Sequence, residues 1–374
     1  MKKLMTAAFL GCVGAVSVAG ADLEERISQL EAAADLDALT SRLTLGGYGE
    51  FHATRKNGAT YGDYHRVVMY AGYQFTDSIR LNSEIELEHS KTQDGDLNEN
   101  GYVLLEQFAV DIDVSENNTV RLGRFLAPLG IVGPNHEPPL FYGVEHPNFE
   151  KYILPSTWSI DGVGVVGDLS ADVSYQVYAV GGLDGSSFSE GSGIRGGREA
   201  AYPGLESPSL TGRLDYFGIE NLRVGGAFYT GSTDYGAKGA DAMTDGEVNI
   251  LSVDAEYTSG ALTLNYVWAA GDHKGNGKLV GDEKYAAASD FGGYYMTAGY
   301  EIWRDGERAV IPFVRKGSYD THEASTNDGS NDTEIDSTQF GLHVPLSDQF
   351  VLKADLLDEN DVETFSVGFG MMFQ

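Results

Sequence analysis

The sequence is poor in cysteine, in proline and in long apolar runs. Cys12 is the only cysteine among 374 residues, and the chain has 10 prolines. Beyond residue 21 no apolar run reaches the roughly 18 residues that a membrane-spanning helix needs. The sequence therefore excludes a helical membrane protein, and a single cysteine excludes a disulfide framework.

Basic residues are scarce as well. Lysine and arginine number 25 against 56 aspartates and glutamates, which gives a formal net charge of −31. Such an excess of carboxylates repels nucleic acid, so no nucleic-acid partner is expected. By contrast, glycine (48 residues) and tyrosine (21) are abundant, and the hydrophobic fraction is 42%. This mixture disfavours both a helical enzyme and a disordered chain.

The first 21 residues have the pattern of a cleaved signal peptide. Lysines at positions 2 and 3 precede an apolar stretch over residues 4–18, and small residues at 19–21 form a cleavage site. Cys12 lies inside this segment, and the Leu-Gly-Cys sequence that it ends leaves lipidation open as an alternative. Cleavage after Ala21 would leave a mature protein without a thiol, and hence without a cysteine metal site.

Residues 22–42 form the one convincing helical stretch. Leu23, Ile27, Leu30 and Ala34 recur at a four-three-four spacing, which predicts a coiled-coil seam of about two heptads. A helix of this length is marginal alone, so an oligomer would have to hold it together. An acidic linker is the alternative.

From residue 43 onwards the apolar period changes from helical to two. Ile79, Leu81, Ile85 and Leu87 alternate with polar residues, and residues 364–373 end the chain with an alternating aromatic segment. Short turns alternate with long polar stretches, which lie around residues 55–63, 91–101, 127–159, 184–207, 233–246, 272–291 and 320–334.

This alternation predicts an all-β fold, a transmembrane antiparallel β-barrel of about 16 strands over residues 43–374. Both termini should lie on the short-turn side. A barrel of that size leaves an aqueous channel. A soluble β-sandwich also alternates, but it would seldom show the asymmetry between short and long connections.

Residues 127–159 make the longest connection, and six of the ten prolines lie between residues 128 and 155. So many fixed φ angles would stiffen a folded loop. We expect this loop to fold inward as a constriction. Capping the barrel, or packing against a neighbouring subunit, is the alternative.

Four short motifs stand in this region. They are Gly-Arg-Phe-x-x-Pro-x-Gly at 123–130, His-Glu-Pro-Pro at 136–139, Phe-Tyr-Gly-Val at 141–144 and Pro-Ser-Thr-Trp at 155–158. Over about residues 118–185 the chain thereby resembles the phosphate-selective porin O and P family. The resemblance implies a sixteen-stranded trimeric channel with a periplasmic N-terminal coiled coil, a constricting third loop and selectivity for phosphate.

Strand parity and the loop together give the candidate pore-lining residues. They are Arg66, Arg80, Glu84, Glu86, Arg121, Arg213 and Lys353 on predicted strands, and Arg124, His136, Glu137 and Lys151 in or beside the loop. Selecting phosphate would require a ladder of arginines and a lysine cluster. Here the inward bases are scattered, and inward acids such as Glu50, Asp254 and Asp355 oppose them. We therefore expect a cation-biased pore, with phosphate or anion selectivity as the alternative.

A catalytic interpretation would use His136, Glu137 and Ser156. Ser156 lacks a G-x-S-x-G elbow, and the prolines after Glu137 exclude an H-E-x-x-H helix, so no catalytic residue is expected. Residues 191–196 match a dinucleotide fingerprint in their letters, but no βαβ unit surrounds them. No cofactor is predicted.

Two oxygen-rich stretches, at residues 94–100 and 327–332, raise the question of divalent cations. The first has Asp or Asn at alternate positions, as calcium loops do, but Leu105 stands where a bidentate glutamate would be needed. Weak calcium binding or bridging to lipopolysaccharide is one interpretation, and a solvated charged loop is the other. No metal site is assigned.

Together these features predict a porin of a Gram-negative-type outer membrane, exported with a cleaved signal peptide. It would form a homotrimer, contact outer-membrane lipid and lipopolysaccharide, and pass small hydrophilic solutes by passive diffusion. An outer-membrane enzyme and a plugged barrel that serves as an adhesin are the alternatives of other classes.

Overall fold

The computed structural model describes residues 41–89, 101–189, 191–198, 208–233, 246–274, 289–323 and 333–373. The chain divides into two units, Met1–Leu43 and Thr44–Gln374, and nearly all of the strand residues belong to the second. The predicted signal peptide, the predicted helical segment apart from its last two residues, and both oxygen-rich stretches lie outside the described residues.

Seventeen strands follow one another along the chain. They are β1 (Leu43–Lys56), β2 (Ala59–Thr76), β3 (Ile79–Glu88), β4 (Tyr102–Ser115), β5 (Asn118–Leu126), β6 (Ser159–Ser170), β7 (Val173–Val180), β8 (Ser209–Ile219), β9 (Leu222–Ser232), β10 (Glu247–Ser259), β11 (Leu262–Lys274), β12 (Ser289–Tyr300), β13 (Trp303–Asp305), β14 (Arg308–Glu323), β15 (Glu334–Ser347), β16 (Phe350–Glu359) and β17 (Val362–Phe373).

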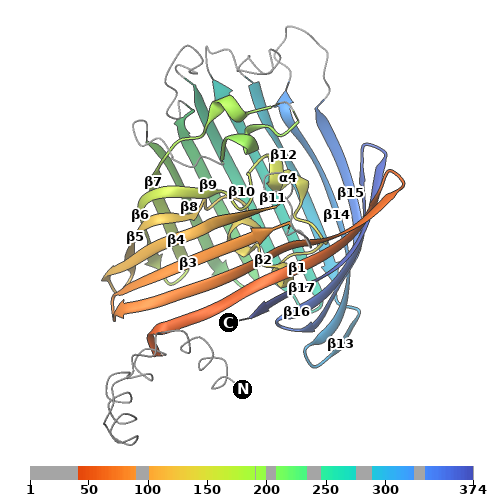
Figure 1. Cartoon of the computed structure of the whole chain (residues 1–374), viewed down its shortest axis with the longest axis horizontal. Helices are drawn as coiled ribbons and strands as arrows, with labels where there is room; N and C mark the ends of the chain where they lie inside the picture. The colour runs from red at the N-terminus through yellow and green to blue at the C-terminus, as the bar shows by residue number, and fades with distance from the viewer. Residues whose placement is uncertain are drawn as a thin grey trace, which may run out of the picture. The chain divides into compact units, whose positions relative to one another are not determined.

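The strands close into a single antiparallel barrel (Figure 1). Each strand pairs with its neighbour in the chain, and β1 pairs with β17 as well as with β2, which leaves no free sheet edge. The short strand β13 pairs with β14, as β12 does, so β12 and β13 together count as one strand of the barrel wall. The wall therefore has sixteen strands. The predicted sixteen-stranded barrel is confirmed. Among the described residues, no helix is long and apolar enough to cross a membrane.

The connections at one end of the barrel, here called the turn end, are the predicted tight turns. At the other end, here called the loop end, one expectation is wrong. The stretch around residues 55–63 is not a long loop, because β1 and β2 are joined by Asn57 and Gly58 alone, at φ 52° and 79°. Asn-Gly with both φ values positive is the favoured two-residue hairpin turn. Asn360 and Asp361 join β16 to β17 in the same way.

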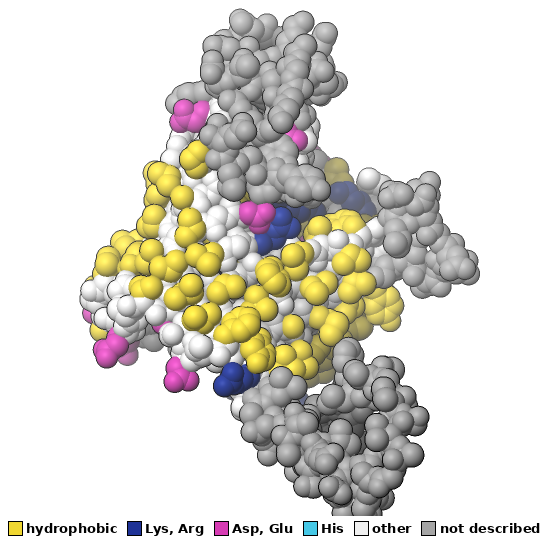
Figure 2. Space-filling model, turned by 60° about the vertical axis from the view of Figure 1, so that its left-hand side comes forward, with side chains coloured by type: hydrophobic (Ala, Val, Ile, Leu, Met, Phe, Trp, Pro, Cys, Tyr) yellow, Lys and Arg dark blue, Asp and Glu magenta, His cyan; other side chains and the backbone are white. Residues whose placement is uncertain are grey.

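Side chains alternate between the two faces of the wall, as the period of two predicts. On β2 and β3 the outward Met69 and Ile85 are 56% and 43% exposed, whereas Arg66, Glu84 and Glu86 are buried inside. Apolar side chains form a broad band over the outer face, with charged side chains at its margins (Figure 2). A band of this kind is stable against lipid, where exposed apolar surface carries no hydration cost.

About half of the interior holds an apolar core. Side chains from the connection after β5 (Leu129, Ile131, Phe149, Ile153, Leu154 and Trp158) pack with inward residues of the wall (Tyr178, Tyr229, Ile250, Val267 and Tyr295). The connection contains η2 (Gly133–Asn135), η3 (Pro138–Leu140) and α4 (Asn148–Tyr152), and α4 lies within the ring of strands (Figure 1).

A second connection, after β7, joins this core through Leu183, Phe188 and Ile194. It contains η4 (Gly185–Ser187) and η5 (Ile194–Arg198). The glycines at 191–196 that resembled a dinucleotide fingerprint lie here: Gly193 forms an isolated bridge with Ser189, and Gly196 lies within η5. They are therefore part of a connection between antiparallel strands.

Candidate permeation site

Residues 127–158, here called the inner loop, cross the interior of the barrel. Their backbone carbonyls accept hydrogen bonds from arginines on three wall strands: Gly130 from Arg213 (β8, 3.0 Å), His136 from Arg66 (β2, 3.3 Å) and Tyr142 from Arg315 (β14, 2.7 Å). The amide of Val144 donates to Asp355 of β16 at 2.6 Å. A segment held by strands so widely spread around the wall has to pass through the lumen.

A buried carboxylate fixes the path of the inner loop. Glu150, which is 0% exposed, accepts hydrogen bonds from the amide of Val132 (2.8 Å) and the hydroxyl of Tyr295 (2.5 Å). Burial raises the pKa of Glu150 to about 7, against the effect of these donors. Gly130 packs against it at φ +69°, where a Cβ would lie 2.4 Å from the carboxylate, so only glycine fits.

Between the inner loop and β1–β4 lies a group of polar and charged side chains, and this region is here called the passage. At its centre the Nε of Arg66 donates to Glu50 at 2.6 Å, and both side chains are buried. A second carboxylate, Glu86, lies 3.9 Å from the same guanidinium. The guanidinium also lies 5.2 Å from the centre of the Tyr48 ring. Arg66 is thus surrounded by opposite charge.

On the turn-end side of this pair, His136 meets two glutamates. Its Nε2 lies 3.3 Å from Oε1 of Glu84, whose other oxygen accepts a hydrogen bond from Gln107. Although burial favours the neutral imidazole, the carboxylates of Glu106 and Glu84 raise the pKa of His136 to about 9. The neighbouring Glu137 accepts a hydrogen bond from the hydroxyl of Tyr70.

On the loop-end side, histidines line the mouth of the passage. Nδ1 of His52 lies 2.7 Å from Glu145, and its Nε2 lies 3.2 Å from Glu50. Although a partial loss of hydration opposes ionisation of Glu145, whose side chain is 47% exposed, His52 holds its pKa well below the ordinary value. The ring of His65 stacks on His52 at 4.6 Å. Five of the eight histidines, at positions 52, 65, 89, 136 and 146, contact the passage or its mouth.

A cavity lies on each side of the central Arg66–Glu50 pair. The turn-end cavity, of about 460 Å³, is lined by Thr44, Gly72, Glu84, Arg121 and His136 among others. The loop-end cavity, of about 320 Å³, is lined by residues that include His52, Glu145 and Lys151. The charged side chains of the passage therefore lie between two cavities, each large enough to hold several water molecules.

Of the residues chosen from the sequence, five gather at the passage. They are Arg66, Glu84, Glu86, His136 and Glu137. Lys151 lines the loop-end cavity. Arg80 and Arg121 lie nearer the turn end, where each pairs with a carboxylate of β4, at 2.8 Å in both cases.

Two further candidates lie elsewhere in the lumen. Arg213 forms bidentate pairs with Asp215 and Asp254 under the apolar half of the inner loop. Lys353 of β16 lies two strands from His52, through Gly368 of β17, with its ammonium group 3.5 Å from the centre of the Phe141 ring.

Arg124 does not join the others, because its side chain lies on the outer face of the barrel. It forms a bidentate pair with Asp161 of β6 at 2.7 Å for both bonds. Phe108 of β4 is the register partner of Arg124 of β5, and the side chain of Phe108 is 47% exposed. A fixed ion pair within an apolar outer surface is unusual for a lipid-facing wall, since charge is costly there.

Three acids of the passage, Glu50, Glu106 and Glu145, were not among the candidates chosen from the sequence. Glu50 has the predicted inward parity but was not chosen, and nothing in the sequence shows that it pairs with Arg66. Glu106 was missed because β4 carries a bulge opposite Glu84 and Ile85, which turns both Glu106 and Gln107 inward. A strict period of two cannot place two consecutive residues on one face.

The structure separates the residues of the catalytic interpretation. His136 bonds to Glu84 and to the carbonyl of Gly133, whereas the backbone amide of Ser156 bonds to the carbonyl of Glu150. Among the described residues, the side chains of His136 and Ser156 make no hydrogen bond with each other. They do not form a nucleophile and base.

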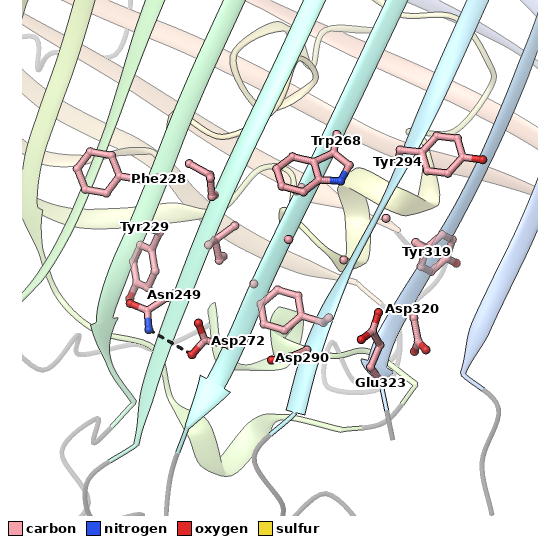
Figure 3. Close-up of a pocket in the computed structure, with 18 of the residues that line it drawn as sticks. Phe228, Tyr229, Asn249, Trp268, Asp272, Asp290, Tyr294, Tyr319, Asp320 and Glu323 are labelled. Atoms are coloured by element: carbon pink, nitrogen blue, oxygen red, sulfur yellow. Dashed lines mark hydrogen bonds between the residues drawn. The ribbon is translucent and has the colours of Figure 1, made fainter. Parts of the chain in front are cut away.

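A hollow of about 700 Å³ lies against β9–β12 and β14 near the loop end (Figure 3). Phe228, Trp268 and Tyr294 lie in a row across these strands, and Asp272 and Asp320 lie nearer the strand ends. Because Phe228 and Tyr294 are about 40% exposed while their strand neighbours Tyr229 and Tyr295 are buried inside, this row faces outward. It resembles an interfacial aromatic girdle with an acidic rim.

Comparison with known proteins gives no family at the level of sequence, because no known protein family matches the chain. An uncharacterised protein of Aquifex aeolicus is 28% identical over 355 residues, which cover 88% of this chain and 80% of that protein. Membership of the phosphate-selective porin O and P family therefore stays a prediction.

Solved structures of outer-membrane porins share the fold. OmpF of Salmonella typhi matches with a TM-score of 0.61 at 13% identity, over 88% of this chain and 97% of that one. An anion-selective porin from Comamonas acidovorans matches with a TM-score of 0.58 at 13% identity, over 88% and 99%. The trimer form of OmpT, an outer membrane protein of Vibrio cholerae, gives 0.55 at 12%, over 88% and 98%. The chain thus has the fold of the outer-membrane porins.

Proposed function

We propose that this chain is an outer-membrane porin in which small hydrophilic solutes and ions diffuse through the passage, with a bias towards cations. The excess of carboxylates around the passage carries the proposal. Its acids are Glu50, Glu84, Glu86, Glu106, Glu137 and Glu145. The cations that face them are Arg66, Lys151 and the imidazolium of His136, with Arg315 in the loop-end cavity, and Arg66 is already paired with Glu50.

The size of the effect follows from Coulomb's law. One uncompensated carboxylate about 4 Å from the path of an ion contributes about 1 kcal/mol in bulk water and about 4 kcal/mol at the effective dielectric near a protein surface. Since 1.4 kcal/mol corresponds to a factor of ten, a few such groups favour K⁺ over Cl⁻ by about tenfold or more.

A second candidate is the anion-selective porin that the resemblance implies. Two cations in the lumen support it, because neither Arg315 nor Lys353 forms an ion pair with a carboxylate among the described residues. Arg315 lines the loop-end cavity beside Tyr142, and Lys353 lies beside Phe141, two strands from His52 through Gly368 of β17. The acids of the passage outnumber them, so cation bias is the function that the geometry supports better.

We further propose that the protein is a homotrimer, exported by the cleaved segment 1–21, with its turn end towards the periplasm. The outward pair of Arg124 and Asp161 supports an interface at β4–β6, since a neighbouring subunit would cover a charge that lipid disfavours. The outward aromatic row and acidic rim of β9–β12 would then contact lipid and lipopolysaccharide.

Thiol labelling of single channels tests the porin function directly. The mature protein has no cysteine, so Glu86→Cys and Leu87→Cys each introduce one thiol, the first inward and the second 38% exposed on the outer face. A charged, water-soluble thiosulfonate should lower the stepwise current of Glu86→Cys and leave that of Leu87→Cys unchanged. Absence of stepwise conductance in both variants and in the unmodified protein would instead support a plugged barrel.

A further inference from the structure

Three side chains of the passage bring metal-ligating atoms together. A carboxylate oxygen of Glu84, one of Glu106 and an imidazole nitrogen of His136 all lie within 4.8 Å of one another. The three residues come from β3, β4 and the inner loop, and their exposed fractions are only 2%, 2% and 3%. Buried carboxylates rarely gather without a positive partner, because each loses its hydration.

The carboxylate of Glu106 lacks the donors that a buried anion needs. Neither of its oxygens has a hydrogen-bond partner among the described residues. The hydroxyl of Tyr48, whose ring packs edge-on against His136 at 5.6 Å, is likewise buried without a partner. The bulge in β4 turns Glu106 towards Glu84, which adds a like charge to the lost hydration. The arrangement is therefore short of positive charge at one point.

The other two groups are already held in the orientation that a metal ligand requires. Nδ1 of His136 lies 3.0 Å from the carbonyl of Gly133, so Nδ1 carries a proton and Nε2 faces Glu84. Gln107 donates to the outer oxygen of Glu84 and leaves the inner oxygen towards His136. Such supporting hydrogen bonds are what orient the ligands of metal sites.

We propose that Glu84, Glu106 and His136 bind a divalent transition-metal ion such as Zn²⁺ in the wall of the passage. Imidazole and carboxylate ligands suit Zn²⁺, and three protein ligands leave a fourth position open. Calcium and magnesium prefer six or more oxygen ligands, which this site does not offer. Glu84 and His136 also line the turn-end cavity, through which the ion would arrive. The metal site depends on the proposed porin function only in that the ion would reach it through the channel.

The mouth of the passage offers the main rival site. His52, His65 and Glu145 lie within 4.8 Å of one another, as do Asp63, His65 and His89. In these groups, however, the carboxylates of Glu145 and Asp63 already bond to histidines, at 2.7 and 2.5 Å. A metal there would only replace existing bonds, whereas at the proposed site it would replace the longer 3.3 Å contact of His136 with Glu84 and also supply the partner that Glu106 lacks.

Calorimetric titration of the purified, chelator-stripped mature protein with Zn²⁺ tests the proposal. We expect one Zn²⁺ per chain, with affinity at least about tenfold weaker in Glu106→Gln and in His136→Gln. His343→Gln is the matched control, because His343 is also buried in the lumen but belongs to none of the three groups of metal-ligating residues. His65→Gln, at the mouth, should bind Zn²⁺ as the unmodified protein does.

Three results would overturn the assignment: no binding of Zn²⁺, binding that survives Glu106→Gln and Glu84→Gln, or binding lost in His65→Gln. The carboxamide variants keep the volume of the side chain and remove its charge, so they remain informative if His136→Gln does not fold. Current in metal-free KCl is recorded for every variant. Normal current without Zn²⁺ binding would refute the metal site and keep the porin, and absence of current would refute the porin.

Discussion

Arg66 donates from Nε to Oε1 of Glu50 at 2.6 Å, across the two strands that begin the barrel wall. The pair neutralises the one arginine at the centre of the passage. The field there is consequently set by the remaining acids, of which Glu86 is 3.9 Å from Arg66. The arrangement explains how a passage that contains an arginine can still favour cations.

The substitution Glu50→Gln should release the charge of Arg66. The K⁺-to-Cl⁻ permeability ratio is expected to fall by about fivefold or more, because one unit of negative charge is lost beside the path. Reversal potentials in a KCl gradient measure this ratio. Glu301→Gln is the control, since Glu301 pairs only with Arg304 beyond the end of β12. An unchanged ratio in Glu50→Gln would place the ion path elsewhere.

Removal of the arginine that holds the start of the inner loop should destabilise the barrel. Arg213→Met removes the bidentate partner of Asp254, which is 0% exposed and keeps its 2.6 Å contact with Arg223, and it also removes the hydrogen bond to Gly130. Breaking a buried ion pair on one side costs about 3–5 kcal/mol. Denaturant unfolding of the refolded protein measures the loss. Arg304→Gln, in an exposed pair, should show no measurable change.

Glu150 should make stability depend on pH in a defined direction. Burial raises its folded pKa from 4.5 to about 7, so the folded state binds more protons between these values and stability falls as the pH rises through them. At pH 8 the ionised group costs about 3 kcal/mol. Glu150→Gln should therefore melt at a higher temperature than the unmodified protein at pH 8, and at nearly the same temperature near pH 4.5.

Glu145→Gln provides a control of opposite sign for that experiment. The pKa of Glu145 is held well below 4.5, so its ionised form stabilises the fold above that pH and the contribution is lost on acidification. This variant should melt at a lower temperature than the unmodified protein at pH 8. Melting curves that shift in the same direction for both variants would contradict the assigned pKa values.

The outward ion pair predicts how subunits associate. Asp161→Arg would place two positive charges side by side on the outer face, and the trimer should dissociate. Combining it with Arg124→Asp restores the pair with exchanged signs and should restore the trimer. Light scattering of the detergent-solubilised protein measures the mass of each variant. A monomeric unmodified protein, or a trimer that tolerates Asp161→Arg alone, would show that β4–β6 do not form the interface.

The barrel could be predicted from the sequence because its wall obeys a single rule. Apolar residues such as Ile85 and Leu87 alternate with Glu84 and Glu86, and this alternation fixes which side chains face lipid. The hairpin at Asn57 and Gly58 was missed, although Asn-Gly is a turn signal, because the flanking residues are as polar as those of a loop.

The contacts of the passage could not be predicted, because they depend on long-range placement. Glu50 and Arg66 are close only through strand pairing, and the inner loop brings His136 to Glu84 across 52 positions. Glu106 depends on a bulge that breaks the alternation itself. Arg124 was chosen because it lies next to the inner loop in the sequence. Because side chains alternate along a strand and Phe125 faces inward, the side chain of Arg124 faces outward.

The reversal potential of the unmodified protein in a KCl gradient across a planar bilayer tests the central claim most directly. Carboxylate control of the passage predicts stepwise openings with K⁺ favoured over Cl⁻ by about tenfold or more. Stepwise openings with Cl⁻ favoured would contradict it, and would show that Arg315 and Lys353 govern the path instead.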